Sequence, residues 1–172
     1  MLTTSLLNTE YDEYYQRYID NVSKDLTLME ALEKGRENVI NFFERIPKEK
    51  QEYKYAEDKW TIKEVLQHLI DTERIFSYRF FRIGRRDTTS LAGFEQDDYI
   101  QPSRANEKSM QELISEFKIT RAYSLSILES LRNDDLLFVG KANMSPVSAR
   151  AAAFIIPGHD IWHMKIIKER YL

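Results

Sequence analysis

The sequence predicts an all-α protein, an antiparallel four-helix bundle with an additional short N-terminal helix. Three observations indicate this fold class. The 172 residues include only 5 glycines and 4 prolines, which leaves few turn-forming residues for a protein of many short strands. Apolar residues recur at helical spacing in several long segments. Two of these segments begin with a capping box, which is a local signal of a helix N-terminus.

The N-terminal part of the chain predicts one short helix and one long helix. Residues 10–22 place tyrosines at helical spacing, which suggests an aromatic-rich helix laid across a larger body. A second helix is expected over residues 25–46, where Pro47 ends it because proline cannot continue a helix. In the polar segment that follows, Tyr53 and Tyr55 are the expected anchors.

A third helix is expected over residues 61–86. Thr61 and Glu64 have the spacing of a capping box, and Trp60 comes directly before them. After this helix, residues 87–107 are predicted to form a loop. A loop of about 20 residues is unusually long for a compact domain, so we expect a functional role for it.

A fourth helix is expected over residues 109–131, because Ser109 and Glu112 form a second capping box. Residues 133–145 are irregular and are compatible with a short hairpin.

The last helix is predicted to run from Ser145 to Tyr171. Ser145 would cap it, with Pro146 at its first position, where proline is well tolerated. Pro157 lies inside this helix and removes one backbone hydrogen bond. The length is that of one domain, so residues 1–172 are interpreted as a single helical-bundle domain.

The composition argues against several functional classes. A net charge of −3 does not favour a nucleic-acid or membrane-surface partner. The absence of cysteine excludes disulfides, thiolate metal ligands and a cysteine nucleophile. No apolar run has the length of a membrane span, and the first residues lack the basic region of a signal peptide. We therefore expect a cytoplasmic protein.

Three histidines form the main candidate site. His159 and His163 are four residues apart, so they share one face of the last helix. His68 lies in the middle of the third helix and completes a set of three if the two helices are neighbours. Neutral imidazoles suit zinc, nickel, iron or copper, and three protein ligands leave a position open for water or substrate. The alternative is three unrelated surface or core histidines.

Two known metal-site patterns fit poorly. Residues 159–163 (HDIWH) are similar to the zinc-protease pattern H-E-x-x-H. However, the shorter Asp160 replaces the glutamate that acts as general base, and too few residues follow His163 for a downstream ligand. A di-iron site needs paired Glu-x-x-His motifs, and Glu64 and His68 have the wrong spacing.

Two charged residues fall on apolar helix faces. Glu73 lies on the apolar face of the third helix and Arg121 on that of the fourth. Since a buried charge must be paired, we expect them to form an ion pair inside the bundle. The alternative is that either side chain extends to solvent. A basic run near the end of the third helix is interpreted as an ion-paired surface, with anion binding as the alternative: Arg79, Arg82, Arg85 and Arg86.

Four motifs resemble the DinB-like superfamily, which includes bacillithiol-transferase-like metalloproteins. The strongest are residues 60–74 (WTIKEVLQHLIDTER) and 158–172 (GHDIWHMKIIKERYL). Residues 55–60 (YAEDKW) and 93–99 (GFEQDDY) resemble a subgroup of the family. The motifs occur in the same order and span nearly the whole chain, so the set is more specific than any one of them.

The resemblance implies a four-helix bundle with one divalent metal ion, zinc, nickel or iron, held by His68, His159 and His163. It also implies that homodimers are common. Characterised members of the family are S-transferases that use low-molecular-weight thiols such as bacillithiol or mycothiol, and other members have no known activity.

We therefore predict metal-assisted transfer of a small-molecule thiol to an electrophile. The absence of cysteine agrees with a sulfur supplied by the co-substrate. Asp71 and Asp160 are predicted to orient the imidazoles, and no residue is assigned as general base or other catalytic group. The long loop, with Asp97, Asp98 and Tyr99, is expected to cover the site. The alternatives are a metal-dependent hydrolase of small amides or esters and a non-catalytic metal-binding stress protein.

Overall fold

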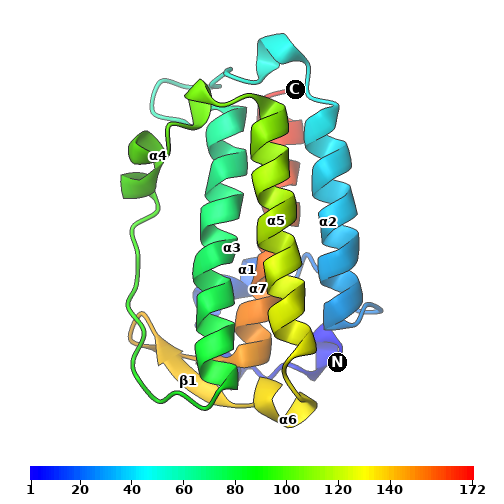
Figure 1. The fold of residues 1–172 in the computed structure, drawn as a ribbon, viewed down its shortest axis with the longest axis vertical. Helices are drawn as coiled ribbons and strands as arrows, with labels where there is room; N and C mark the ends of the chain where they lie inside the picture. The colour runs from blue at the N-terminus through cyan, green and yellow to red at the C-terminus, as the bar shows by residue number, and fades with distance from the viewer.

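Four long helices form a bundle in the computed structural model, which describes residues 1–172 (Figure 1). No helix in the structure combines the length and the apolar character that a membrane crossing would require. The four helices are α2 (Leu28–Glu44), α3 (Ile62–Gly84), α5 (Met110–Glu129) and α7 (Ala149–Arg170). This arrangement confirms the predicted all-α four-helix bundle, although two pairs of neighbouring helices, α3 with α5 and α2 with α7, are parallel instead of antiparallel.

The helices alternate around the bundle so that α2 and α3 occupy opposite corners. Each of these two helices packs against both α5 and α7. In Figure 1, α3 and α5 run in one direction, whereas α2 and α7 run in the other. Two neighbouring helices can be parallel because the segment between α3 and α5 returns along the full length of the bundle.

Local hydrogen bonds confirm both predicted capping boxes. Thr61 Oγ1 accepts a bond of 3.1 Å from the backbone of Glu64, whose carboxylate accepts one of 2.7 Å in return. Ser109 and Glu112 repeat the arrangement, with bonds of 3.2 and 2.7 Å. A third capping box at Thr27 starts α2 three residues later than the sequence suggested.

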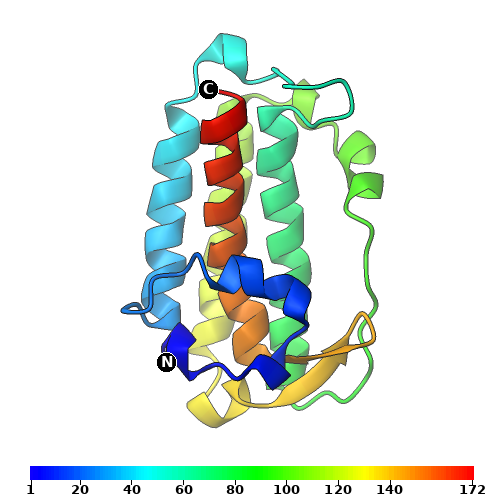
Figure 2. The same cartoon turned by 180° about the vertical axis from the view of Figure 1, so that it is seen from behind.

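The N-terminal segment is more irregular than predicted. It contains the 3-10 helices Thr3–Ser5, Asn8–Glu10 and Glu13–Tyr15, and only Gln16–Ile19 is α-helical, as α1. Figure 2 shows this segment lying across α7.

The prediction of a loop over residues 87–107 is wrong in part. This segment contains α4 (Asp97–Ser103) and a 3-10 helix (Ala105–Glu107). No side chain caps the start of α4, and Pro102 lies inside it, so the usual sequence signals of a helix are missing. Another 3-10 helix (Lys48–Lys50) follows α2.

The predicted start of the last helix is also wrong. Ser145 and Pro146 belong to a hairpin, and Ser148 caps α7 by accepting a bond of 3.0 Å from the backbone of Ala151. Proline fits there because this strand has a partner on one side only.

The short helix α6 (Asn133–Leu136) precedes the hairpin strands β1 (Val139–Ala142) and β2 (Ser145–Ser148), which pair antiparallel.

The core consists of two apolar clusters separated by buried polar side chains. Along α3, Ile70 belongs to one cluster and Phe76 to the other, with Glu73 between them. Arg121 of α5 and Asp160 of α7 lie at the same level and contact each other. We call Glu73, Arg121 and Asp160 the central polar layer.

Candidate metal centre

The structure brings the three predicted histidines together. His68 comes from α3, and His159 and His163 come from successive turns of α7, which packs against α3. The Nε2 atom of His159 lies 3.1 Å from Nε2 of His68 and 3.0 Å from Nε2 of His163. All three side chains are at least nine-tenths buried. Their ring nitrogens therefore converge on one point inside the bundle.

Hydrogen bonds between the three imidazoles cannot by themselves explain why their Nε2 atoms lie so close together. Nε2 of His159 faces two other Nε2 atoms, but a neutral imidazole offers one donor or one acceptor at that atom. A shared cation accounts for the arrangement better. Two nitrogens that each lie about 2.05 Å from a tetrahedral zinc ion are about 3.3 Å apart, which is close to the observed spacing. The three residues thus fit a divalent metal ion.

The protonation state of the cluster also suits metal binding. Burial lowers the pKa of His68 to about 4. The pKa values of His159 and His163 are also lowered well below 6.5, first by burial and then by the electrostatic influence of neighbouring imidazoles and Arg17. The rings are therefore neutral at physiological pH, which is the form that binds metals.

Aromatic side chains hold the imidazole rings in place. The one hydrogen-bonding partner of the rings outside the cluster is Thr72, whose Oγ1 lies 3.5 Å from Nδ1 of His68. Ring packing therefore contributes more to their orientation than hydrogen bonding does. The centroid distances are 5.0 Å for Tyr18 and His159, 4.7 Å for Trp162 and His163, and 4.7 Å for Trp60 and His68.

The prediction that Asp71 and Asp160 orient the imidazoles is wrong. Asp71 accepts hydrogen bonds from Gln67 and Arg74, at 3.1 and 3.0 Å. Asp160 accepts a bond of 2.6 Å from Arg121 in the central polar layer. Neither carboxylate forms a hydrogen bond with a ring nitrogen of the three histidines.

The predicted ion pair between Glu73 and Arg121 is confirmed. Arg121 is fully buried and donates to both carboxylate oxygens of Glu73, at 2.6 and 3.1 Å. It also donates to Asp160 and to the carbonyl of Leu32, at 2.6 and 2.8 Å. Burial raises the pKa of Asp160 and Arg121 opposes this rise. Since Asp160 follows His159 directly, this network fixes the rotation of α7 at the histidine cluster.

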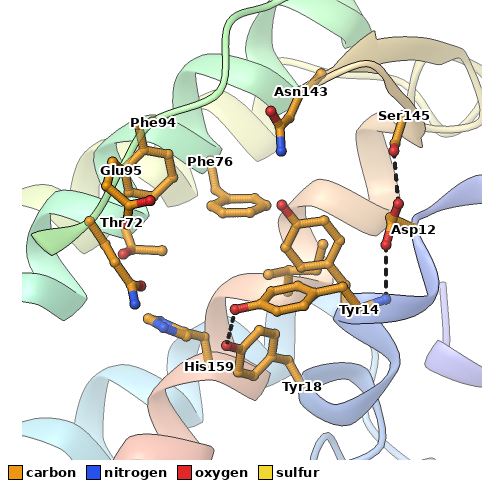
Figure 3. Close-up of a pocket in the computed structure, with 14 residues that line it drawn as sticks. Asp12, Tyr14, Tyr18, Thr72, Phe76, Phe94, Glu95, Asn143, Ser145 and His159 are labelled. Carbon is orange, nitrogen blue, oxygen red and sulfur yellow. Dashed lines mark hydrogen bonds between the residues drawn. The ribbon is translucent and has the colours of Figure 1, made fainter.

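A first cavity of about 390 Å³ opens beside His159 (Figure 3). Tyr14, Phe76 and Thr72 face it, and Asp12 is held at its rim by a bond of 2.8 Å from Ser145. The whole lining consists of Asp12, Tyr14, Tyr15, Tyr18, Thr72, Phe76, Phe94, Glu95, Gln96, Ala142, Asn143, Ser145, Ile155 and His159.

A second cavity of about 440 Å³ opens beside His163. Tyr14, Tyr18 and Gln96 line both cavities and so form a wall between them. The histidine cluster can therefore be approached from two sides. The remaining residues of the second cavity include Arg17, Tyr55, Asp58, Lys59, Trp60, Asp97, Trp162 and Tyr171.

The segment after α3 covers the site only with its middle part. Phe94, Glu95 and Gln96 line the first cavity and Asp97 lines the second. The other two residues predicted to cover the site, Asp98 and Tyr99, instead line a shallow groove on the outer side of α3. The prediction of a covering segment is therefore correct for Asp97 alone of the three residues that it named.

The basic run of α3 does not point into either cavity. Arg79 is buried and donates a bond of 3.0 Å to the carbonyl of Ala92, which fixes the covering segment. The other three arginines have partners at the surface: Asp87 for Arg82, Ser130 for Arg85 and Asp135 for Arg86. The interpretation as an ion-paired surface is therefore correct for Arg82 and Arg86, and wrong for buried Arg79 and for Arg85, whose partner is a hydroxyl.

Sequence reasoning missed the contribution of the N-terminal segment. Tyr14, Arg17 and Tyr18 all lie at the histidine cluster, and Tyr18 contacts His159 directly. The sequence signal for this contribution was the run of tyrosines at helical spacing. It indicated that the segment packs on the bundle, but it did not indicate which helices or which side chains the segment contacts.

Comparisons with known proteins agree with this architecture. The model of the DinB superfamily matches residues 31–167. The structure is similar to YfiT from Bacillus subtilis, which is described as a probable metal-dependent hydrolase with an unusual four-helix bundle topology. The TM-score is 0.74 at 13% identity, over 93% of this chain and 91% of YfiT. No curated protein matches the sequence. Since the family model covers most of the chain, the protein belongs to the DinB superfamily.

Proposed function

We propose that the protein is a metal-dependent S-transferase. In this proposal, His68, His159 and His163 hold one divalent ion, and a low-molecular-weight thiol is joined to a small electrophile beside it. The observation that carries the proposal is the convergence of three neutral imidazoles at a point reached from two cavities. Two approaches to one centre suit a reaction with two substrates.

The chain supplies the ligands and the enclosure, and the co-substrate supplies the sulfur. A bound divalent ion would lower the pKa of a thiol and favour the reactive thiolate. The protein has no cysteine of its own. The aromatic rings packed on the imidazoles would shield the thiolate from water on the sides that they cover, which limits competition from hydrolysis.

The proposed reaction forms a carbon–sulfur bond and breaks the bond between carbon and the leaving group. The thiol releases its proton to solvent, and the leaving group departs with the electron pair. Tyr18 is placed to donate a hydrogen bond to that leaving group. Burial and the neighbouring Tyr14 raise the pKa of Tyr18, so its hydroxyl stays protonated. Asp71 and Asp160 have other partners, and no residue is proposed as general base.

One observation favours a second candidate, a hydrolase of small amides or esters. The carboxylate-bearing residue Glu95 lines the first cavity beside His159. A carboxylate in that position could accept a proton from an attacking water. The description of YfiT as a probable metal-dependent hydrolase points in the same direction.

The two candidates can be separated by product analysis. Protein loaded with zinc, nickel or iron would be supplied with cysteine, 2-mercaptoethanol or mercaptosuccinate and with 1-chloro-2,4-dinitrobenzene. The same samples would be supplied with nitrophenyl esters and anilides without thiol. We expect a metal-dependent thioether product. Ester or anilide cleavage without thiol would support the hydrolase, and absence of turnover in both assays would support a non-catalytic metal-binding protein.

The ligand set is tested by metal analysis of the His68→Ala variant. We expect its metal content and its thioether formation to fall together. The control is Tyr78→Ala, which changes an exposed residue of the same helix. Full metal content in His68→Ala would remove His68 from the proposed site. The single domain over residues 1–172, the homodimer and the cytoplasmic location stay predictions.

A further inference from the structure

Arg17 is a cation without an acidic partner at the histidine cluster. None of the ion pairs in the structure includes it. Its guanidinium carbon lies 3.9 Å from the ring centroid of Tyr14 and 5.0 Å from that of Tyr18. Trp162 lies on a third side, at 5.7 Å. The aromatic rings hold the guanidinium in one place. It is a hydrogen-bonding neighbour of the Tyr18 hydroxyl, and its remaining N–H donors are available to a ligand.

The second cavity places this cation in the same space as His163. Lys59 also lines the cavity, but its ammonium group forms an ion pair of 2.5 Å with Asp58. Asp97 lines the cavity too, and its charge acts on Lys59 by raising the pKa of that lysine together with Asp58. The lining thus holds two cations, Arg17 and Lys59, and two anions, Asp58 and Asp97. Lys59 has an ion-pair partner in Asp58 whereas Arg17 has none, so Arg17 is the cation that a carboxylate of a ligand can contact.

The first cavity differs from the second in the charge of its lining. Its lining contains no lysine and no arginine, and its charged residues are Asp12 and Glu95. Phe76, Phe94 and Ile155 supply apolar surface. An anion would be repelled from this side, whereas a neutral apolar molecule would fit. The wall between the cavities thus separates two chemically different spaces.

We propose that the second cavity binds a carboxylate of the thiol co-substrate, and that Arg17 is the residue that recognises it. The first cavity then takes the neutral electrophile, so that both substrates are bound at once. This inference rests on the proposed S-transferase function for the identity of the ligand. A guanidinium group suits the role because it can donate two parallel hydrogen bonds to one carboxylate.

The binding step can be observed without turnover. Both tryptophans of the chain, Trp60 and Trp162, line the second cavity, and neither lines the first. Tryptophan fluorescence of the metal-loaded protein would be titrated with succinate, with the neutral analogue succinamide and with inorganic phosphate. We expect a saturable change with succinate and no change with succinamide. Phosphate binding tighter than succinate binding would overturn the assignment to a carboxylate.

Variants of Arg17 test the residue itself. Arg17→Met keeps most of the apolar stem and removes the charge, so we expect the Kd for succinate to rise about tenfold or more. Arg17→Lys should restore part of the affinity. The control Arg45→Met changes another exposed arginine without an acidic partner, at the end of α2, and should bind as the unmodified protein does. Circular dichroism would establish that each variant is folded.

Kinetics separate this inference from the proposed function. In Arg17→Met, the KM for mercaptosuccinate should rise about tenfold or more while that for 2-mercaptoethanol stays the same. Thioether formation without succinate binding would overturn the subsite and leave the S-transferase standing. Succinate binding that depends on Arg17, without thioether formation, would establish an anion site and overturn the transferase. An equal loss of succinate affinity in Arg45→Met would also overturn the role of Arg17.

Discussion

The backbone carbonyl oxygen of Tyr18 lies 2.1 Å from the position that a Cβ atom on Gly158 would occupy. Only a residue without a side chain permits this approach, so Gly158 allows α1 to cross α7 directly beside the histidine cluster. The crossing brings the ring of Tyr18 onto His159. A backbone contact between distant parts of the chain therefore positions a wall of both cavities.

Gly158→Ala should displace α1. Alanine has a helix propensity about 1 kcal/mol better than glycine, but an overpacked contact costs about 1–3 kcal/mol. We expect the free energy of unfolding to fall or stay level instead of rising. The fluorescence of Trp162, which packs edge-to-face on Tyr18, should change at the same time. Urea denaturation measures the first effect, and a more stable variant with an unchanged spectrum would contradict the proposed contact.

Glu73→Gln should strongly destabilise the protein. The substitution leaves fully buried Arg121 with Asp160 as its remaining acidic partner. Breaking a buried ion pair from one side costs about 3–5 kcal/mol, and chemical denaturation would measure it. The matched control is Glu169→Gln, which breaks an exposed pair of 4.0 Å with Lys165 and should cost less than about 0.5 kcal/mol. Equal effects of the two substitutions would mean that the central polar layer contributes little to stability.

Glu10 should make stability depend on pH in the acid range. Burial raises its pKa, but hydrogen bonds from Arg150 and from the backbone of Leu7 outweigh this, so that the pKa lies below 4.5. A carboxyl whose pKa is lower in the folded than in the unfolded state stabilises the fold above its unfolded-state pKa. That contribution is lost as the pH falls from 4.5 through the folded-state pKa.

The measurement is urea denaturation at several pH values from about 7 to about 3. We expect Glu10→Gln to be less stable than the unmodified protein near neutral pH. The difference between the two proteins should shrink as the pH falls through the acid range. A difference that stays constant over the whole range would show that Glu10 is not the titrating group.

Met144→Gly should stabilise the hairpin. Asn143 and Met144 have φ angles of 50 and 66° in the turn between β1 and β2. A left-handed conformation costs a residue with a side chain about 1–2 kcal/mol, whereas glycine loses about 0.5–1 kcal/mol through its greater freedom in the unfolded chain. The side chain of Met144 is 88% exposed and loses no packing. We expect a gain of up to about 1 kcal/mol by thermal or urea denaturation, and Met144→Ala, as the control, should show none.

Features that follow from local spacing or from the position of a charge on a helix face could be predicted from the sequence. Thr61 and Glu64 form their capping box whatever the rest of the chain does, because the bonds stay within one turn. The pairing of Glu73 with Arg121 was also predictable, since each charge falls on an apolar face and needs a partner. The convergence of the histidines required one further assumption, that α3 and α7 are neighbours.

Features that depend on tertiary packing could not be predicted in the same way. Ser145 followed by proline is a good helix start locally, but Ser145 lies in a hairpin whose first strand is also bridged by the distant Leu91. Asp160 adjoins a candidate ligand, and only the position of Arg121 shows that its carboxylate points elsewhere. The location of Arg17 follows from the crossing at Gly158, which no periodicity reveals.

Tyr14, Arg17 and Tyr18, which line the second cavity, precede residue 31, where the match to the family model begins. The three imidazoles lie within the matched part. The histidine cluster and this part of the cavity walls therefore come from different stretches of the polypeptide. A substitution at Tyr14 or Arg17 can change the shape or charge of a cavity while leaving the three imidazoles in place.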